Sequence, residues 1–344
     1  MTVHEIAELA GVSIGTVDRV LHKRGRVSAI TRAKIEAIIE KHNFTPNLFA
    51  QQLKYNRSYR FSAFLPRRDQ DAGYWGQIIA GIEQASGEIR LMGGITEIVE
   101  FDRYDSAAFE RVSGTVIAGK PDGLLFAPIM PAMTRSFVER VSAEKFPLVF
   151  VDSDMPGVSP LCAIRQDPFG GGYLAGRLFH LFAGAITSPA AVLDVHGEDY
   201  HITRRRDGFL RYAQDHDLPV IVEEYSGCKG EEFSVKEIVR FLGRHQNLSG
   251  LFVTNCMAHR AATAAAERRQ GGEPFFLVGY DLIPENQRLL LEGRIDAIIS
   301  QRPEVQGREA LMALFRSVVL GQFVETRQEI PLDVYIRENT PQIH

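Results

Sequence analysis

The sequence predicts a small all-α helix-turn-helix unit followed by a larger α/β body with two doubly wound lobes. In the first sixty residues, apolar side chains recur at helical spacing on either side of a short turn that contains glycine. Beyond them, short apolar runs alternate with helical stretches, which is typical of repeated βα units. The length of 344 residues exceeds what one ordinary core accommodates.

The predicted N-terminal unit begins with a helix over residues 4–10. Gly11 ends it because glycine adopts left-handed backbone angles without a steric penalty. Ser13 is a suitable N-cap for the next helix, residues 14–21, which carries Asp18 and Arg19 on its polar side. A third helix, expected to start at the cap Thr31, closes a small core.

A further short helix is expected after Pro46, followed by a linker that reaches residue 59. A helix of about nine residues is unstable alone in water. It therefore needs a partner, which we expect to be its symmetry mate, DNA, or both.

The net charge of −4 is unevenly distributed along the chain. Residues 1–60 contain ten Lys or Arg and five Asp or Glu, so they carry +5 and the remaining residues carry −9. A basic segment on an acidic body predicts that only the N-terminus meets a polyanion.

The body contains nine short runs that are apolar throughout, as expected of parallel strands covered on both faces. Ligands of such sheets bind beyond the carboxyl ends of the strands. The candidates at those ends are Tyr74, Trp75, Asp152, Arg204, Arg205, Arg206, Asn255, Asp281 and Gln301. Aromatic rings, acids, amides and a guanidinium in one cleft suit a ligand with many hydroxyl groups. Taken singly, Asp281 could instead cap a helix and Trp75 could be a packing residue.

Several other functions are disfavoured by the sequence. The glycines in residues 167–176 lack the Lys-Ser/Thr of a phosphate loop, and the body has no nucleophile or zinc-protease motif. The three cysteines show no metal-site spacing, which indicates reduced thiols. There is no apparent export signal and no apolar run long enough to span a membrane. We therefore expect a cytoplasmic protein without a metal site or cofactor that is not an enzyme.

Residues 3–53 resemble the lac repressor (LacI/GalR) family of bacterial regulators. The matching segments are "IAELAGVS", "TV-RVL", "VS--TR" and "PN--A--L". The resemblance implies a DNA-binding surface made by Ser13, Ile14, Gly15, Thr16, Arg19, His22, Asn47, Ala50 and Leu53. In it, Ser13 and Thr16 hold phosphates, Arg19 reads a base edge, and Leu53 is a minor-groove wedge.

Two residues depart from the family pattern in this segment. Asp18 stands where members usually have Ser, and Gly15 stands where many have a polar reading side chain. Asp18 could accept a hydrogen bond from cytosine or orient a neighbouring Arg, and the simpler interpretation is that it points away from the groove. Both departures concern which operator is read.

The body resembles periplasmic sugar-binding proteins of the ribose and xylose type, as fused in lac repressor relatives. The segments "R--GF" at 205–209, "VGYD" at 278–281 and "ISQRP" at 299–303 carry this resemblance, together with Asn255. It implies effector-binding roles for Tyr74, Trp75, Asp152, Arg205, Asn255, Asp281 and Gln301. Two residues depart from the pattern. Ser153 stands where ribose binders have Arg, and Cys256 stands where many members have Asp.

The expected domains are a helix-turn-helix over 1–45, a hinge over 46–59 and an effector domain over 60–344. We expect a first lobe of residues 60–162 and 297–325, and a second lobe of residues 163–296 and 326–344.

The predicted function is a regulator, of the repressor type, that binds a near-palindromic operator in double-stranded DNA. It acts as a homodimer or a dimer of dimers, and a small carbohydrate-like effector controls its affinity for DNA. The alternatives are a sugar receptor without a regulatory role and a sugar-acting enzyme.

Overall fold

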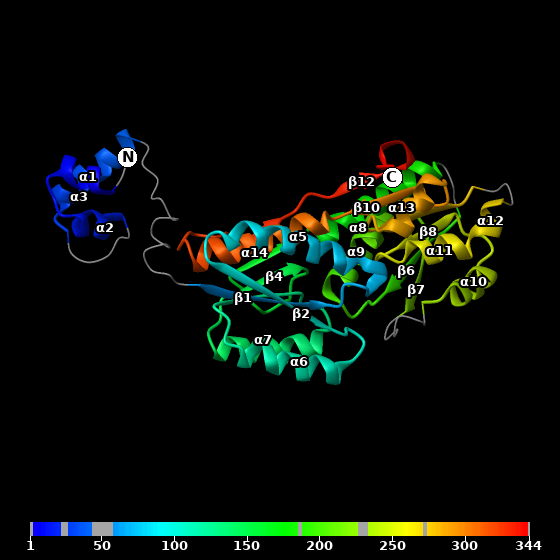
Figure 1. The fold of residues 1–344 in the computed structure, drawn as a ribbon. Helices are drawn as coiled ribbons and strands as arrows, with labels where there is room; N and C mark the ends of the chain where they lie inside the picture. The colour runs from blue at the N-terminus through cyan, green and yellow to red at the C-terminus, as the bar shows by residue number, and fades with distance from the viewer. Residues whose placement is uncertain are drawn as a thin grey trace. The chain divides into compact units, whose positions relative to one another are not determined.

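The computed structural model describes residues 3–21, 27–42, 58–184, 188–225, 233–270 and 274–342. The chain divides into two compact units, Met1–Arg57 and Ser58–His344 (Figure 1). Within the described ranges, no helix is long and apolar enough to cross a membrane.

The first unit contains three helices, α1 (Val3–Ala10), α2 (Ile14–Leu21) and α3 (Ala29–Lys41). Their inward faces bury a small apolar core, as the helical spacing predicts. The buried residues are Ile6, Ala7, Ala10, Val17, Val20 and Ile35.

The turn between α1 and α2 has the geometry expected from its residues. Gly11 has a φ of 66°, in the left-handed region. The Ser13 hydroxyl accepts a hydrogen bond from the Thr16 backbone amide at 3.2 Å and so caps α2. The expected cap of the third helix was wrong: Ser28 caps α3 by accepting from the amide of Thr31, which lies in the first turn. The expected hinge helix falls on residues up to 57 that lie outside the described part of the chain.

The first lobe of the second unit is built on a parallel sheet with the strand order β11-β5-β4-β3-β1-β2. Helices α5 and α14 cover one face of this sheet, and α6 and α7 cover the other (Figure 1). The strands are β1 (Tyr59–Pro66), β2 (Gly94–Phe101), β3 (Gly123–Phe126), β4 (Leu148–Asp152), β5 (Cys162–Arg165) and β11 (Arg327–Glu329). The helices are η1 (Asp71–Gly73), α5 (Tyr74–Arg90), α6 (Ser106–Ala118), α7 (Pro131–Ala143) and α14 (Pro303–Val318).

The second lobe contains a sheet of order β12-β10-β9-β8-β6-β7, in which only the β10–β12 pair among the described pairings is antiparallel. The strands are β6 (Ala190–Val195), β7 (Val220–Tyr225), β8 (Gly250–Val253), β9 (Phe276–Tyr280), β10 (Ala297–Ser300) and β12 (Asp333–Tyr335). The helices are α8 (Pro168–Ala183), α9 (Tyr200–Asp215), α10 (Val235–Arg244), α11 (Ala258–Ala264), α12 (Ala266–Gln270), α13 (Pro284–Leu291) and η2 (Arg337–Asn339).

The lobes exchange chain segments at places other than those expected. β10 was expected in the first lobe, but it pairs with β9 and β12 in the second. β11 and residues 163–165 of β5 were expected in the second lobe, but β11 pairs with β5 and β5 pairs with β4 in the first. The chain therefore crosses between lobes after β5, after β10 and after β11. Strand pairing decides this membership, and the place of a strand along the chain does not specify its partner.

Candidate functional site

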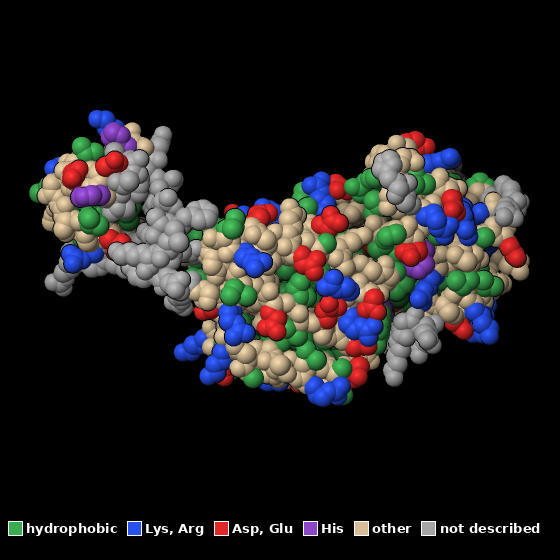
Figure 2. Space-filling model, viewed as in Figure 1, with side chains coloured by type: hydrophobic (Ala, Val, Ile, Leu, Met, Phe, Trp, Pro, Cys, Tyr) green, Lys and Arg blue, Asp and Glu red, His purple; other side chains and the backbone are tan. Residues whose placement is uncertain are grey.

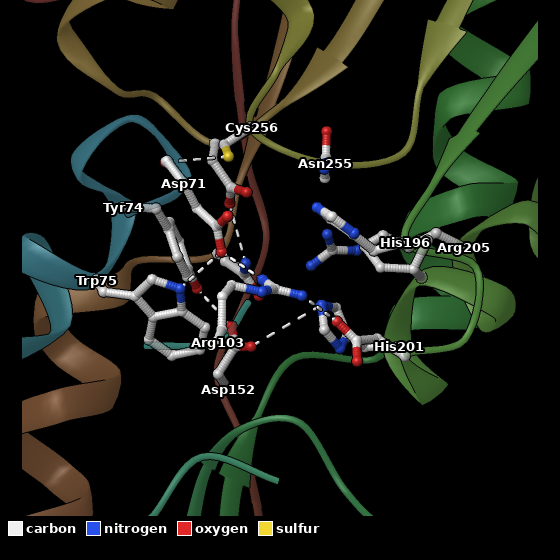
Figure 3. Close-up of a pocket in the computed structure, with 14 residues that line it drawn as sticks. Asp71, Tyr74, Trp75, Arg103, Asp152, His196, His201, Arg205, Asn255 and Cys256 are labelled. Atoms are coloured by element: carbon white, nitrogen blue, oxygen red, sulfur yellow. Dashed lines mark hydrogen bonds and ion pairs between the residues drawn. The ribbon is translucent and has the colours of Figure 1, made fainter. Parts of the chain in front are cut away.

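A pocket lies between the two lobes of the second unit, at the carboxyl ends of their strands (Figure 3). All seven residues predicted to bind the effector line it: Tyr74, Trp75, Asp152, Arg205, Asn255, Asp281 and Gln301. The structure therefore brings these residues together, while their contacts with a ligand stay a prediction. The other lining residues are Asp71, Arg103, His196, Asp199, His201, Ile202 and Cys256.

Several lining residues have left-handed backbone angles, at strand ends or, for Asp71, at the start of η1. Asp71, Asp152, His196 and Asp281 have φ values of 52°, 74°, 64° and 63°. Asp and His tolerate this region better than most residues, although it is strained relative to extended backbone. Such strain is commonly concentrated at functional sites, where the surrounding structure maintains it.

Asp152 ends β4 and is almost completely buried. The Tyr74 hydroxyl donates a hydrogen bond of 2.5 Å to its Oδ1 atom. Burial raises the pKa of Asp152 to about 7, although the Tyr74 hydrogen bond and the nearby Arg205 oppose the shift. This carboxyl group can thus exchange a proton near neutral pH.

Asp281 follows β9 and accepts a hydrogen bond of 2.9 Å from the Gln301 side-chain amide. Burial raises the pKa of Asp281 to about 6, with Arg205 opposing the shift. Asp281 does not cap α13, because the N-cap of that helix is Ile283. Asn255, at the end of β8, accepts from the Met257 amide through its side-chain oxygen at 3.0 Å.

Arg205 lies on α9 and is 1% exposed. Its Nη1 atom donates to the Thr254 carbonyl at 3.0 Å, and its guanidinium lies 3.8 Å from the centre of the Tyr280 ring. Helix α8 approaches this segment closely at Gly172, where an added Cβ would lie 1.8 Å from the Arg205 carbonyl oxygen. A glycine is therefore needed for the two helices to hold Arg205 in place.

Arg103 connects the lobes and was not among the predicted residues. It follows β2 of the first lobe, forms an ion pair with Asp71, and contacts Asp199 of the second lobe at 2.7 Å. Asp71 also accepts from Trp75 Nε1 at 2.7 Å and from the Tyr104 hydroxyl. Although burial opposes it, the charge of Arg103 lowers the pKa of Asp71.

The two predicted aromatic residues donate hydrogen bonds to carboxylates of the pocket. Trp75 and Tyr74 are buried, their rings are nearly perpendicular at 77°, and their polar atoms contact Asp71 and Asp152. The expected stacking on a ligand therefore stays a prediction.

His201 lies beside Asp152, with Nε2 3.9 Å from a carboxylate oxygen and Nδ1 3.2 Å from the Ser153 hydroxyl. Burial lowers the pKa of His201 well below its usual value, so the ring is neutral at physiological pH.

Three lining residues that were not predicted also lie just beyond the carboxyl ends of strands. Arg103 follows β2, and His196 and Asp199 follow β6, so extending the rule to these strands would have found them.

Arg204 and Arg206, which flank Arg205, form ion pairs away from the pocket lining. Arg204 contacts Asp207 at 3.2 Å, and Arg206 contacts Asp194 at 2.9 Å and Glu224 at 3.3 Å. On the face shown in Figure 2, acidic and basic side chains are interspersed in the same way.

In the first unit, the predicted reading residues of α2 lie on its outer side. Ser13, Ile14, Gly15 and Arg19 are exposed and Thr16 is half-buried, while Val17 and Val20 face the core. Asp18 is also exposed. His22, Asn47, Ala50 and Leu53 lie outside the described residues, so their DNA contacts remain predictions.

The pocket offers carboxylates, amides and guanidiniums at its wall, which can bind a small polar molecule through hydrogen bonds. In the described part of the chain, no group of three or more His, Cys, Asp or Glu side chains is arranged to hold a metal ion.

Comparisons with known proteins agree with both units. Residues 2–47 match the family model of bacterial regulatory proteins of the lacI family, and residues 62–322 match the periplasmic binding protein domain. The HTH-type transcriptional regulator DegA of Bacillus subtilis is 26% identical over 288 residues, which cover 81% of each chain. The HTH-type transcriptional repressor PurR of Photorhabdus laumondii is 27% identical over 356 residues, covering 95% of this chain and 99% of the relative. A crystal structure of a putative LacI transcriptional regulator from Bacteroides fragilis aligns with a TM-score of 0.75 and 25% identity, covering 82% of this chain and 98% of that one.

Proposed function

The chain belongs to the lacI family of bacterial regulatory proteins, with a periplasmic binding protein domain, and on this premise we propose that it is a repressor whose operator affinity is controlled by a small effector. Helix α2 reads the operator, and the effector binds in the pocket between the lobes. A twofold dimer presents two α2 helices to a near-palindromic site in double-stranded DNA.

The observation that supports this function best is the pocket between two lobes in a chain that begins with a helix-turn-helix unit. Both lobes contribute polar side chains to the pocket, with Tyr74 and Asp152 from the first and Arg205, Asn255 and Asp281 from the second. A ligand that contacts both lobes stabilises one arrangement of them. Effectors of this kind change DNA affinity by about 1–3 kcal/mol, set by their differential affinity for the two states.

Gln301 connects the pocket to one of the segments by which the chain passes between the lobes. It follows β10 where the chain passes to the first lobe, and its side chain donates to Asp281 in the pocket. Gln306 in α14 of the first lobe donates to the Gln301 carbonyl at 2.9 Å. We propose that a ligand on Asp281 changes this crossing and thereby the arrangement of the lobes.

The test is selection of DNA from a random pool with the full chain, followed by affinity measurements with and without compounds from a sugar library. We expect enriched sequences with two inverted half-sites, and at least one compound that changes operator affinity. A selection that enriches no sequence would contradict the regulatory role, and turnover of a library compound would favour the enzyme alternative.

A further inference from the structure

The walls of the pocket contain more negative than positive groups. Four carboxylates line it, from Asp71, Asp152, Asp199 and Asp281, against the two guanidiniums of Arg103 and Arg205. With all six ionised, these groups leave a formal charge of −2. Uncompensated charge is costly in a buried site, so a ligand is expected to reduce the imbalance.

One guanidinium is already committed to two of the carboxylates. Arg103 pairs with Asp71 and Asp199, and the exposed fractions of these three side chains are 8%, 6% and 2%. Asp199 also accepts from the Met130 amide at 3.1 Å. This group is therefore satisfied by the protein itself.

The carboxylates of Asp152 and Asp281 lack a direct ion pair with the remaining guanidinium, that of Arg205. In the described residues, neither Asp152 nor Asp281 has a Lys or Arg nitrogen within 4.0 Å, and the His201 ring beside Asp152 is neutral. Arg205 instead uses Nη1 on the Thr254 carbonyl and its face on the Tyr280 ring.

The electrostatics of Asp152 and Asp281 agree with this imbalance. Burial raises the pKa of both groups, and the charge of Asp281 raises that of Asp152 further. Ser153, next to Asp152, supplies a hydroxyl bonded to His201 and no positive charge. A cation in the pocket would favour the ionised form of both carboxylates.

We propose that the pocket takes a small polyhydroxylated molecule that carries a basic nitrogen, an amino sugar being the simplest case, with its ammonium group facing Asp152 and Asp281. An acidic sugar or sugar phosphate would add charge of the same sign as the excess and is rejected. The inference rests on the proposed function only in taking this pocket as the effector site.

Matched ligands separate charge from shape. The probes are D-glucosamine, D-galactosamine and D-mannosamine, each beside its N-acetyl form, its parent hexose and the corresponding uronic acid. Affinities are measured by calorimetry on the full chain without DNA, at neutral pH. We expect at least one amino sugar to bind about tenfold or more tightly than its N-acetyl form and its parent hexose.

The outcomes distinguish the proposal from its rivals. Equal or tighter binding of the parent hexose, binding of a uronic acid, or no binding of any amino sugar would overturn it. None of these results bears on operator selection, which tests the proposed function independently.

Variants test the residues. In Asp281→Asn and Asp152→Asn, the preference for the amine over its N-acetyl form should fall about tenfold, because each change removes one negative charge. Asp207→Asn is the control, since Asp207 pairs with Arg204 and Arg206 away from the pocket lining, and it should keep the preference. Thermal melting checks that each variant folds, and either Asn variant alone suffices. An unchanged preference in a folded Asn variant would overturn the assignment.

Discussion

Arg103 and Asp199 form a buried ion pair of 2.7 Å between the two lobes. Together with the contact of Arg103 to Asp71, this pair links the first lobe to the second. The connection between the lobes therefore depends on charges that the protein itself supplies.

Removing this connection should cost stability. In Arg103→Met, Asp71 and Asp199 would be left buried without a cation, a change that typically destabilises by about 3–5 kcal/mol. Denaturant unfolding measures the loss. Arg67→Met is the control, because Arg67 and Asp69 form an exposed pair that should contribute far less. Equal losses of unfolding free energy in the two variants would show that the connection between the lobes stabilises the protein no more than an exposed ion pair does.

The stability of the protein without ligand should depend on pH through Asp152. Its pKa is raised to about 7 from an ordinary value of 3.8, so between these limits the folded state holds a proton that the unfolded state releases. Stability from this group therefore falls as pH rises, by up to about 1.4 kcal/mol per pH unit. Asp152→Asn removes the effect, so the variant should gain stability relative to the wild type between about pH 4 and about pH 7. Parallel stability profiles for the two proteins would disprove this assignment.

Gly172→Ala should destabilise the protein and displace Arg205, which lines the pocket. The added methyl group would lie 1.8 Å from the Arg205 carbonyl oxygen, forcing α8 and α9 apart. We expect a loss of about 1–3 kcal/mol in unfolding experiments, with weaker ligand binding. Gly114→Ala, in α6 with no atom within 4 Å, is the matched control and should gain about 0.5–1 kcal/mol. If both variants behaved alike, close packing at Gly172 would not be needed.

Arg19→Ala should weaken operator binding much more than binding to random DNA. The side chain is exposed on α2, and a bidentate contact with guanine gives about 1–3 kcal/mol of discrimination. Fluorescence anisotropy on both DNAs measures the difference. Lys41→Ala, on α3, removes one exposed positive charge without changing α2, so any loss of affinity that it causes should be similar for the two DNAs. Equal losses in Arg19→Ala would rule out base reading.

The sequence predicts much of the fold because its signals are local. The nine apolar runs correspond to β1, β2, β3, β4, β6, β7, β8, β9 and β10, and α2 begins and ends where its pattern does. The strands β5, β11 and β12 were missed, because they are short and contain charged residues, so none of them forms an apolar run. The lobe boundaries were misplaced because strand pairing decides which lobe a strand joins, and β10 was assigned to the wrong lobe although its run was recognised.

The part of the candidate site that lies at strand ends could be predicted from the sequence. Asp152, Asn255 and Asp281 follow from one rule about parallel sheets. The partnership of Arg103 with Asp199 could not be read, because it depends on how two lobes face one another and not on any spacing in the chain.

The left-handed backbone at Asp71, Asp152 and Asp281 limits how this pocket can evolve. Branched and bulky side chains are strained at such angles, whereas Asn, Asp, Gly and His are accommodated. Exchange of Asp for Asn keeps the shape of the wall and removes one unit of charge. A lineage of such repressors can therefore acquire effectors of different charge through single substitutions at these positions, without rebuilding the scaffold that holds them.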